Sequence, residues 1–234
     1  MEVLIINGSP RKGRMHTGRI VSHFAEGMKE AGANVETIYS IALSIGDCKG
    51  CFNCWTKTPG KCIQDDDMTD VLSKMASADI LVLATPVYVD GMTGSLKTLI
   101  DRFLPHLKGR FVIRDDHCRH PVREHVKQGK VVLVSVSGFT ELDNFDPLIN
   151  HVRAICKNMN REFAGALVRS VAWIMDGAAE QGVQLDSIYE AVRQAGRELV
   201  STGSMREETL ETIRRDFVPR DTVVQLTQGF YDEE

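Results

Sequence analysis

Long apolar runs, aromatic residues and an excess of charge of one sign are all scarce in this chain of 234 residues. No stretch approaches the roughly 20 apolar residues of a membrane-spanning helix, so we expect no contact with a bilayer interior. The formal net charge of -4 at pH 7 gives no global attraction to nucleic acid or to anionic lipid. With 43% hydrophobic and 26% charged residues, the composition is typical of a globular domain.

The beginning of the chain also lacks the features of a secretory signal. Met1–Pro10 passes from a short apolar run directly into a loop, without a charged start, a longer apolar stretch or a cleavage site. Six cysteines without an export signal indicate a reducing, cytoplasmic compartment. In such a compartment, clustered thiols bind metal or carry out redox chemistry more often than they form disulfides.

Apolar, β-branched runs alternate with segments of helical periodicity along the chain. The predicted strands are Glu2–Ile6, Asn34–Tyr39, Ile80–Ala84, Lys130–Val136 and Ala164–Ile174. The predicted helices are Thr17–Ala31, a helix capped by Asp65–Asp67 that runs through Met75, Ser95–Leu107, Phe145–Met159 and Leu185–Val200. This alternation predicts right-handed crossovers and an α/β fold, a doubly wound parallel sheet of five strands with helices on both faces.

Two segments do not fit the repeat. Residues 110–129 are polar and rich in His and Arg, and we expect an excursion between the third helix and the fourth strand. Residues 205–234 form a predicted extension, with a helical pattern at Glu207–Phe217 followed by a Pro-interrupted end. We therefore expect one domain at 1–204 and an extension that packs on this domain or on a partner subunit.

The loop after the first strand, Gly8–Thr17, has the composition of an anion site. It lacks the Lys and Ser or Thr of a nucleoside triphosphatase loop, because Arg14 and Met15 stand there, and only Gly8 and Gly13 fit a dinucleotide fingerprint. Its position before a helix favours a phosphate monoester, with a solvated basic turn as the alternative. The candidate phosphate ligands are Ser9, Arg11, Lys12, His16 and Thr17.

The motif N-G-S-P-R-K followed by Thr17 resembles the first FMN loop of the NAD(P)H-dependent FMN reductase family within the flavodoxin-like fold. One residue is inserted before Thr17, and His16 stands where that family often has Asn. Thr85–Met92 and Ser137–Glu141 are similar to the second and third FMN loops of the family. The resemblance implies the strand order 2-1-3-4-5, FMN as cofactor, NAD(P)H or ferredoxin as electron donor, and a homodimer or homotetramer.

Loops at the carboxyl ends of parallel strands converge at a topological switch point, where an apolar slot rich in backbone amides suits a flavin ring. An isolated Tyr88 would be a core residue, but in this loop we interpret it as a flavin contact. The candidate ring contacts are Pro86, Val87, Tyr88, Val89, Asp90, Gly91, Ser137, Gly138 and Phe139.

Four cysteines lie within fifteen residues, inside a loop at 46–64. The spacing Cys48-x2-Cys51-x2-Cys54-x7-Cys62 differs from the ferredoxin run, which ends C-x3-C-P and shares its ligands between two clusters. A single [4Fe–4S] cluster is our first interpretation, with structural zinc and unligated thiols as alternatives. The spacing also resembles that of the iron-sulfur flavoprotein branch of the same family, in which the cluster exchanges electrons with FMN.

The sequence therefore predicts an FMN-dependent oxidoreductase, with no catalytic acid or base assigned. A non-enzymatic electron carrier is the second hypothesis, and a metal-stabilised binding module without flavin is the third. Cys118, between His117 and His120, is interpreted as part of a polar surface loop, and Cys156 as a core residue.

Overall fold

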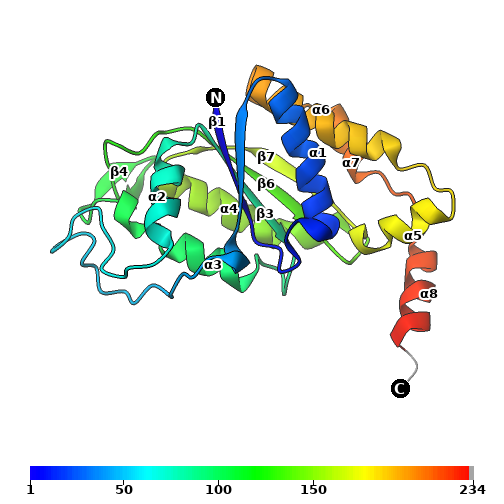
Figure 1. The fold of residues 1–234 in the computed structure, drawn as a ribbon, viewed down its shortest axis with the longest axis horizontal. Helices are drawn as coiled ribbons and strands as arrows, with labels where there is room; N and C mark the ends of the chain where they lie inside the picture. Colours follow the sequence, from blue (N-terminus) through cyan, green and yellow to red (C-terminus); the bar gives the residue numbers. More distant parts are fainter. Residues whose placement is uncertain (232–234) are drawn as a thin grey trace.

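The computed structural model describes residues 1–231 and shows one parallel sheet between two layers of helices (Figure 1). The strands lie in the order β2-β1-β3-β6-β7, and all of them are parallel. They are β1 (Glu2–Asn7), β2 (Asn34–Tyr39), β3 (Ile80–Pro86), β6 (Lys130–Val136) and β7 (Glu162–Arg169). Counted as five parallel strands along the chain, this is the order 2-1-3-4-5, so the predicted doubly wound sheet is confirmed.

Helices cover both faces of the sheet because the strands carry apolar side chains on both faces. One face packs on α1 (His16–Glu30), α5 (Met175–Glu180), α6 (Asp186–Thr202) and α7 (Glu207–Arg214). The other packs on α2 (Met68–Ser77), α3 (Gly94–Asp101) and α4 (Asp146–Met159). Successive strand residues point to opposite faces, so Val3 and Ile5 join the first core while Leu4 and Ile6 join the second.

Short 3₁₀ helices occur at η1 (Lys12–Arg14), η2 (Ser40–Ala42), η3 (Leu104–His106), η4 (Leu142–Phe145) and η5 (Ala172–Ile174).

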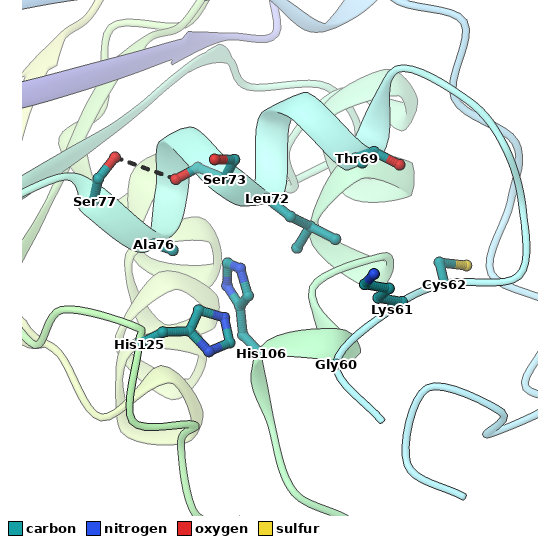
Figure 2. A pocket seen from close by; sticks show the side chains of 10 residues that line it. All are labelled: Gly60, Lys61, Cys62, Thr69, Leu72, Ser73, Ala76, Ser77, His106 and His125. Carbon is teal, nitrogen blue, oxygen red and sulfur yellow. Dashed lines mark hydrogen bonds between the residues drawn. The ribbon is translucent and has the colours of Figure 1, made fainter. Parts of the chain in front are cut away.

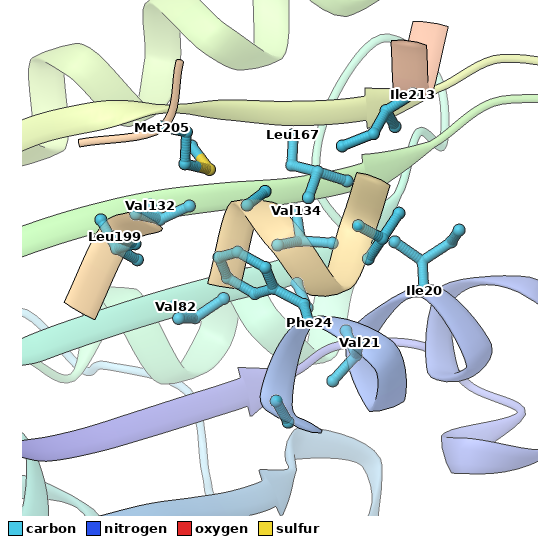
Figure 3. Packing of buried hydrophobic residues seen from close by; sticks show 14 of the residues in the cluster. Ile20, Val21, Phe24, Val82, Val132, Val134, Leu167, Leu199, Met205 and Ile213 are labelled. Carbon is cyan, nitrogen blue, oxygen red and sulfur yellow. The ribbon is translucent and has the colours of Figure 1, made fainter. Parts of the chain in front are cut away.

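Figure 3 shows the first core, where Phe24 of α1 lies over Val82 and Val134 of neighbouring strands. Ile20, Phe24 and Met28 are buried at helical spacing, so they form the apolar stripe that docks α1 on the sheet.

Two predicted boundaries are wrong. The fifth strand ends at Arg169, not Ile174, because Val171 adopts a positive φ of 50° and starts a 3₁₀ turn. The third helix ends at Asp101, and Leu104–His106 is a separate turn that contains Pro105. Among the predicted capping residues of α2, Asp66 accepts from the Met68 N–H through Oδ1 at 3.1 Å, whereas Asp67, at the N-cap position, makes no capping bond.

The excursion at 110–129 contains an antiparallel hairpin of β4 (Val112–Arg114) and β5 (His117–Arg119). Asp115 and Asp116 join these strands with φ of 52° and 58°, as a two-residue turn of this hand requires. Cys118 is exposed on β5, and Cys156 is buried in α4, where burial raises the pKa of its thiol to about 12.

The extension packs on the domain through α7, whose Leu210 and Ile213 join the first core. Buried Arg169 donates to the carbonyls of Ile213 and Arg215, each at 2.7 Å, and so ties the segment after α7 to the end of β7.

The sequence did not predict α8 (Arg220–Tyr231), which projects from the body in Figure 1 and packs through Val223. Residues 232–234 of the predicted extension lie outside the described residues. Within residues 1–231, every helix is too short or too polar to cross a membrane.

Candidate functional site

The first strand-end loop packs closely against the loop after β3 at Gly8, where a larger side chain would not fit. The Gly8 N–H donates to the Ala84 carbonyl at 2.7 Å, and Thr93 Oγ1 donates to the Gly8 carbonyl at 2.8 Å. A Cβ at Gly8 would lie 2.7 Å from Thr93 Oγ1 and 2.8 Å from Leu96 Cβ. The glycine therefore permits the close approach that fixes this loop against the second one.

Helix α1 begins at this loop with backbone donors that no side chain satisfies. Its N-cap residue, Met15, makes no capping hydrogen bond, and the first residues of the helix are His16 and Thr17. Uncapped N–H groups and the helix dipole together favour an anion at this position. Burial lowers the pKa of His16, and the charges of Arg19 and Arg11 lower it further. The site is therefore electropositive even with a neutral imidazole.

The second loop forms a tight turn beside this helix end. Tyr88 and Gly91 exchange backbone hydrogen bonds of 3.0 and 3.1 Å, and the residues between them, Val89 and Asp90, have φ of 46° and 60°. A β-branched residue such as Val rarely adopts a positive φ, and such strain is concentrated at functional sites. Val89 is fully exposed at the tip of the turn, so no packing in this chain explains its conformation.

The third loop is fastened to the turn that follows β7. The Ser137 N–H donates to the Arg169 carbonyl at 3.1 Å, and the Val171 N–H donates to the Phe139 carbonyl at 3.2 Å. Trp173 Nε1 donates to the Gly138 carbonyl at 3.0 Å. The loop after β6 and the turn after β7 are therefore fixed to each other by hydrogen bonds.

These loops line one cavity of about 170 Å³ that is open to solvent. Its lining includes nine of the predicted flavin-site residues, namely Ser9, Arg11, His16, Thr17, Pro86, Val87, Tyr88, Ser137 and Gly138. The other predicted residues, Lys12, Val89, Asp90, Gly91 and Phe139, belong to the same loops but do not line it. The structure thus brings all three predicted loops together at one edge of the sheet.

Four further residues line the cavity that sequence reasoning missed: Met15, Val136, Ala172 and Trp173. Two of them follow β7, whose carboxyl end must lie at the same sheet edge as the other loops. Trp173 is one of only two tryptophans in the chain. The sequence could therefore have indicated Trp173 as a cavity residue, because it follows a strand whose end lies at the same sheet edge as the three predicted loops.

The cysteine loop is fixed by hydrogen bonds of its own side chains and of Arg123 outside it. Trp55 Nε1 donates to the Leu104 carbonyl at 2.9 Å, and Arg123 Nη2 donates to the Cys54 carbonyl at 3.1 Å. Gln64 Nε2 donates to the Asp47 carbonyl at 3.1 Å, which joins the two ends of the loop. The loop is therefore a structured element that these contacts place on the domain.

All four predicted metal-ligating cysteines line a single cavity, together with Lys49, Phe52, Ile63, Gln64, Arg102, Leu104 and Pro105. Burial raises the pKa of the Cys54 thiol, and the neighbouring Cys62, Cys48 and Cys51 raise it further. Four thiols and the amide of Gln64 are therefore the possible side-chain ligands, in a lining that contains two cations and no carboxylate. Within residues 1–231, no three His, Cys, Asp or Glu side chains are arranged to hold a single metal ion.

Comparison with known protein families explains this combination of loops. Residues 1–144 match the model of the family described as NADPH-dependent FMN reductase. The chain belongs to this family. The match ends within η4, so it includes the cysteine loop and all three predicted flavin loops.

Relatives of this FMN reductase family member include two iron-sulfur flavoproteins. One from Archaeoglobus fulgidus is 39% identical over 115 residues, which are 49% of this chain and 55% of the relative. One from Methanosarcina thermophila is 32% identical over 115 residues, or 49% of this chain and 59% of the relative. The chain thus spans little more than half the length of these curated relatives.

Solved structures share the flavodoxin-like fold of this family member. An FMN-dependent NADH-azoreductase from Bacillus anthracis, solved with FMN, has a TM-score of 0.63 at 16% identity, over 86% of this chain and 99% of that one. An NAD(P)H:quinone oxidoreductase from Methanothermobacter marburgensis has a TM-score of 0.60 at 17% identity, over 85% and 96% of the two chains. At this identity the similarity establishes the fold alone.

A larger cavity, of about 510 Å³, also has Cys62 in its lining (Figure 2). Figure 2 shows His106 and His125 below α2, with Leu72 and Ala76 of that helix above them. His106 is buried, and burial lowers the pKa of its imidazole to about 4, with the nearby His125 adding to the shift. His106 is therefore neutral in the folded protein at neutral pH.

The pKa of His106 predicts how stability changes with pH. Between the ordinary pKa of 6.5 and about 4, the unfolded chain binds a proton that the folded chain refuses. Neutral His106 therefore contributes fully to the free energy of unfolding above pH 6.5. This contribution is lost as the pH falls towards 4, and the total loss is about 3 kcal/mol. We expect His106→Phe to remove this loss, measured as urea unfolding free energies at pH 7.0, 5.5 and 4.5.

A matched control for this experiment is His117→Gln, because His117 is exposed on the hairpin. The control should retain the wild-type loss of stability between pH 6.5 and 4. If His106→Phe retains it as well, another group is responsible for the pH dependence.

Proposed function

We propose that this chain is an FMN-dependent oxidoreductase that accepts electrons from a reduced nicotinamide and exchanges them with a [4Fe–4S] cluster on its cysteine loop. One observation carries the proposal: the uncapped start of α1 and two further strand-end loops line one cavity, while four thiols line another. Membership of the NADPH-dependent FMN reductase family supports the flavin part.

The phosphate of FMN is assigned to the start of α1. Ser9, Thr17 and the uncapped backbone amides supply hydrogen-bond donors, and Arg11 supplies a guanidinium. Neutral His16 supplies one further ring N–H, and a bound dianion would raise the pKa that Arg11 and Arg19 now lower. This donor set fits a phosphate monoester.

The flavin ring is assigned to the slot between the second and third loops. The second loop contributes Pro86, Val87 and Tyr88 to the lining, and the segments after β6 and β7 contribute Gly138 and Trp173. FMN, when bound, supplies a centre that accepts two electrons as hydride and releases them singly. Tyr88 and Phe139 are 52% and 67% exposed, which leaves apolar surface for the ring or for a substrate beside the cavity. The five predicted residues outside the lining belong to the same three loops, Lys12 to the phosphate loop and the others to the second and third loops.

The cluster is assigned to Cys48, Cys51, Cys54 and Cys62. The cavity lining supplies four sulfur ligands and no carboxylate or imidazole, and Lys49 with Arg102 offset the negative charge that a thiolate-ligated cluster carries. The names of the iron-sulfur flavoproteins, similar over about half of this chain, support a cluster over zinc or free thiols.

The oligomeric part of the proposal is a homodimer or homotetramer. The exposed Tyr88, Val89 and Phe139 beside the flavin cavity and the projecting α8 provide apolar surface for a second copy. A second copy could bring the flavin of one subunit to the cysteine loop of another. The chain's mass in solution, measured by light scattering, tests this part.

The function is tested on protein purified under anaerobic conditions. We expect bound FMN, about four irons and four sulfides per chain, and oxidation of NADH or NADPH with ferredoxin as acceptor. Failure to bind FMN at saturation would overturn the proposal. Zinc without sulfide would replace the cluster by a structural ion. Fast exchange with ferredoxin, without oxidation of either nicotinamide, would make the protein an electron carrier rather than an enzyme.

A further inference from the structure

Arg102, directly after α3, places a guanidinium under the cysteine loop with its side chain only 1% exposed. Its Nη2 donates to Cys62 Sγ at 3.3 Å and to Asp66 Oδ1 at 3.0 Å. Its Nη1 donates to Asp66 Oδ2 at 2.7 Å and to the Gly46 carbonyl at 2.6 Å. One side chain therefore joins the beginning and the end of the loop to one of the four sulfurs.

Both terminal nitrogens of this guanidinium are committed to fixed partners. The bidentate pair with Asp66 sets the plane of the guanidinium, since the carboxylate also accepts from the Gly46 and Met68 N–H groups, each at 3.1 Å. The N–H aimed at Cys62 is consequently preorganised. A lysine has neither the planar fork nor enough donors in the right directions to reproduce this arrangement.

We propose that Arg102 is a positioning residue that raises the reduction potential of the cluster through its N–H to the Cys62 sulfur. The inference rests on the cluster of the proposed function. Reduction adds negative charge that spreads to the cysteine sulfurs, and a charged N–H donor stabilises the more negative state. Outer-shell hydrogen bonds of this kind also orient the ligand itself.

Arg123 provides a matched control in the same loop. Its Nε donates to the Pro105 carbonyl at 2.8 Å and its Nη2 to the Cys54 carbonyl at 3.1 Å. Arg123 therefore braces a cluster-ligand residue through the backbone and donates to no sulfur. A purely structural role for either arginine would affect iron content and stability but would leave the potential of the loaded cluster unchanged.

The experiment is a reductive titration of the anaerobically purified full chain, followed by visible absorbance and electron paramagnetic resonance. We expect Arg102→Lys to lower the ratio of reduced to oxidised cluster about tenfold at a fixed potential, which is about 59 mV for one electron. Asp66→Glu should also lower the midpoint, because it keeps the carboxylate charge but displaces the guanidinium plane that aims the N–H at Cys62. Arg123→Lys should keep the wild-type midpoint.

The outcomes separate this inference from the proposed function. Wild-type protein without iron and sulfide would overturn the cluster, and this inference with it. An iron-loaded Arg102→Lys variant with the wild-type midpoint would overturn the inference alone. If Arg102→Lys loses its iron, a lowered midpoint in Asp66→Glu decides in favour and a wild-type midpoint there decides against. Loss of iron from both variants would show that Arg102 only stabilises the structure of the loop, and it would overturn the inference.

Discussion

Changing Cys51 to Ser is expected to remove nearly all the iron and sulfide from the anaerobically purified protein while one FMN per chain remains bound. A [4Fe–4S] cluster needs four thiolate ligands, and a serine hydroxyl does not deprotonate to replace one. Cys51 is an exposed residue, so this exchange leaves the core intact, whereas Cys54 is buried. The separate flavin cavity contains none of the four cysteines, which is why flavin binding should survive.

The matched control for this variant is Cys118→Ser. Cys118 is also exposed but lies on β5, outside the cysteine loop. It should keep the wild-type absorbance, with about four irons per chain. A Cys51→Ser protein that also kept its full iron content would show that Cys51 is not a ligand. Metal analysis that found zinc in the wild type, with loss in the variant, would retain the ligand assignment and change the metal.

The parallel sheet and the convergence of three strand-end loops on one cavity could be predicted because they depend on local patterns. A strand buried on both faces is a charge-free apolar run, and the loop after it must lie at one edge of the sheet. The residues of Ile80–Ala84 and the loop after them show both features, and the structure places Pro86 and Tyr88 in the cavity. Four clustered cysteines are likewise visible without any coordinates.

The features that the sequence did not reveal depend on single backbone conformations or on distant contacts. Val168–Ile174 is apolar enough to continue a strand, and only the positive φ of Val171 ends it and turns Trp173 into the cavity. Pro219 was interpreted as an interruption, although proline is common where a helix begins, and α8 starts at the next residue. The contact of Arg102 with Cys62 joins residues 40 positions apart, so no local pattern reports it.

Changing Gly18 to Ala is expected to weaken FMN binding about 100-fold, which is about 2.7 kcal/mol. Gly18 lies in the first turn of α1, and a Cβ there would be 2.5 Å from Gly13 Cα and 2.7 Å from the Gly13 carbonyl oxygen. These atoms are backbone, so the phosphate loop must move away from the helix. That movement separates the Ser9 and Arg11 side of the cavity from the amides at His16 and Thr17, which are proposed to hold the same phosphate.

Gly94→Ala provides the matched control. Gly94 begins α3, directly after the Thr93 that binds the first loop, and a Cβ there meets no atom within 4 Å. FMN affinity, measured by fluorescence quenching, should stay within about threefold of wild type in this variant, because no group moves. Urea unfolding without FMN separates a displaced loop from a destabilised domain, since overpacking typically costs about 1–3 kcal/mol of folding free energy. A folded Gly18→Ala protein that binds FMN as tightly as the control would show that the phosphate does not lie between the loop and the start of α1.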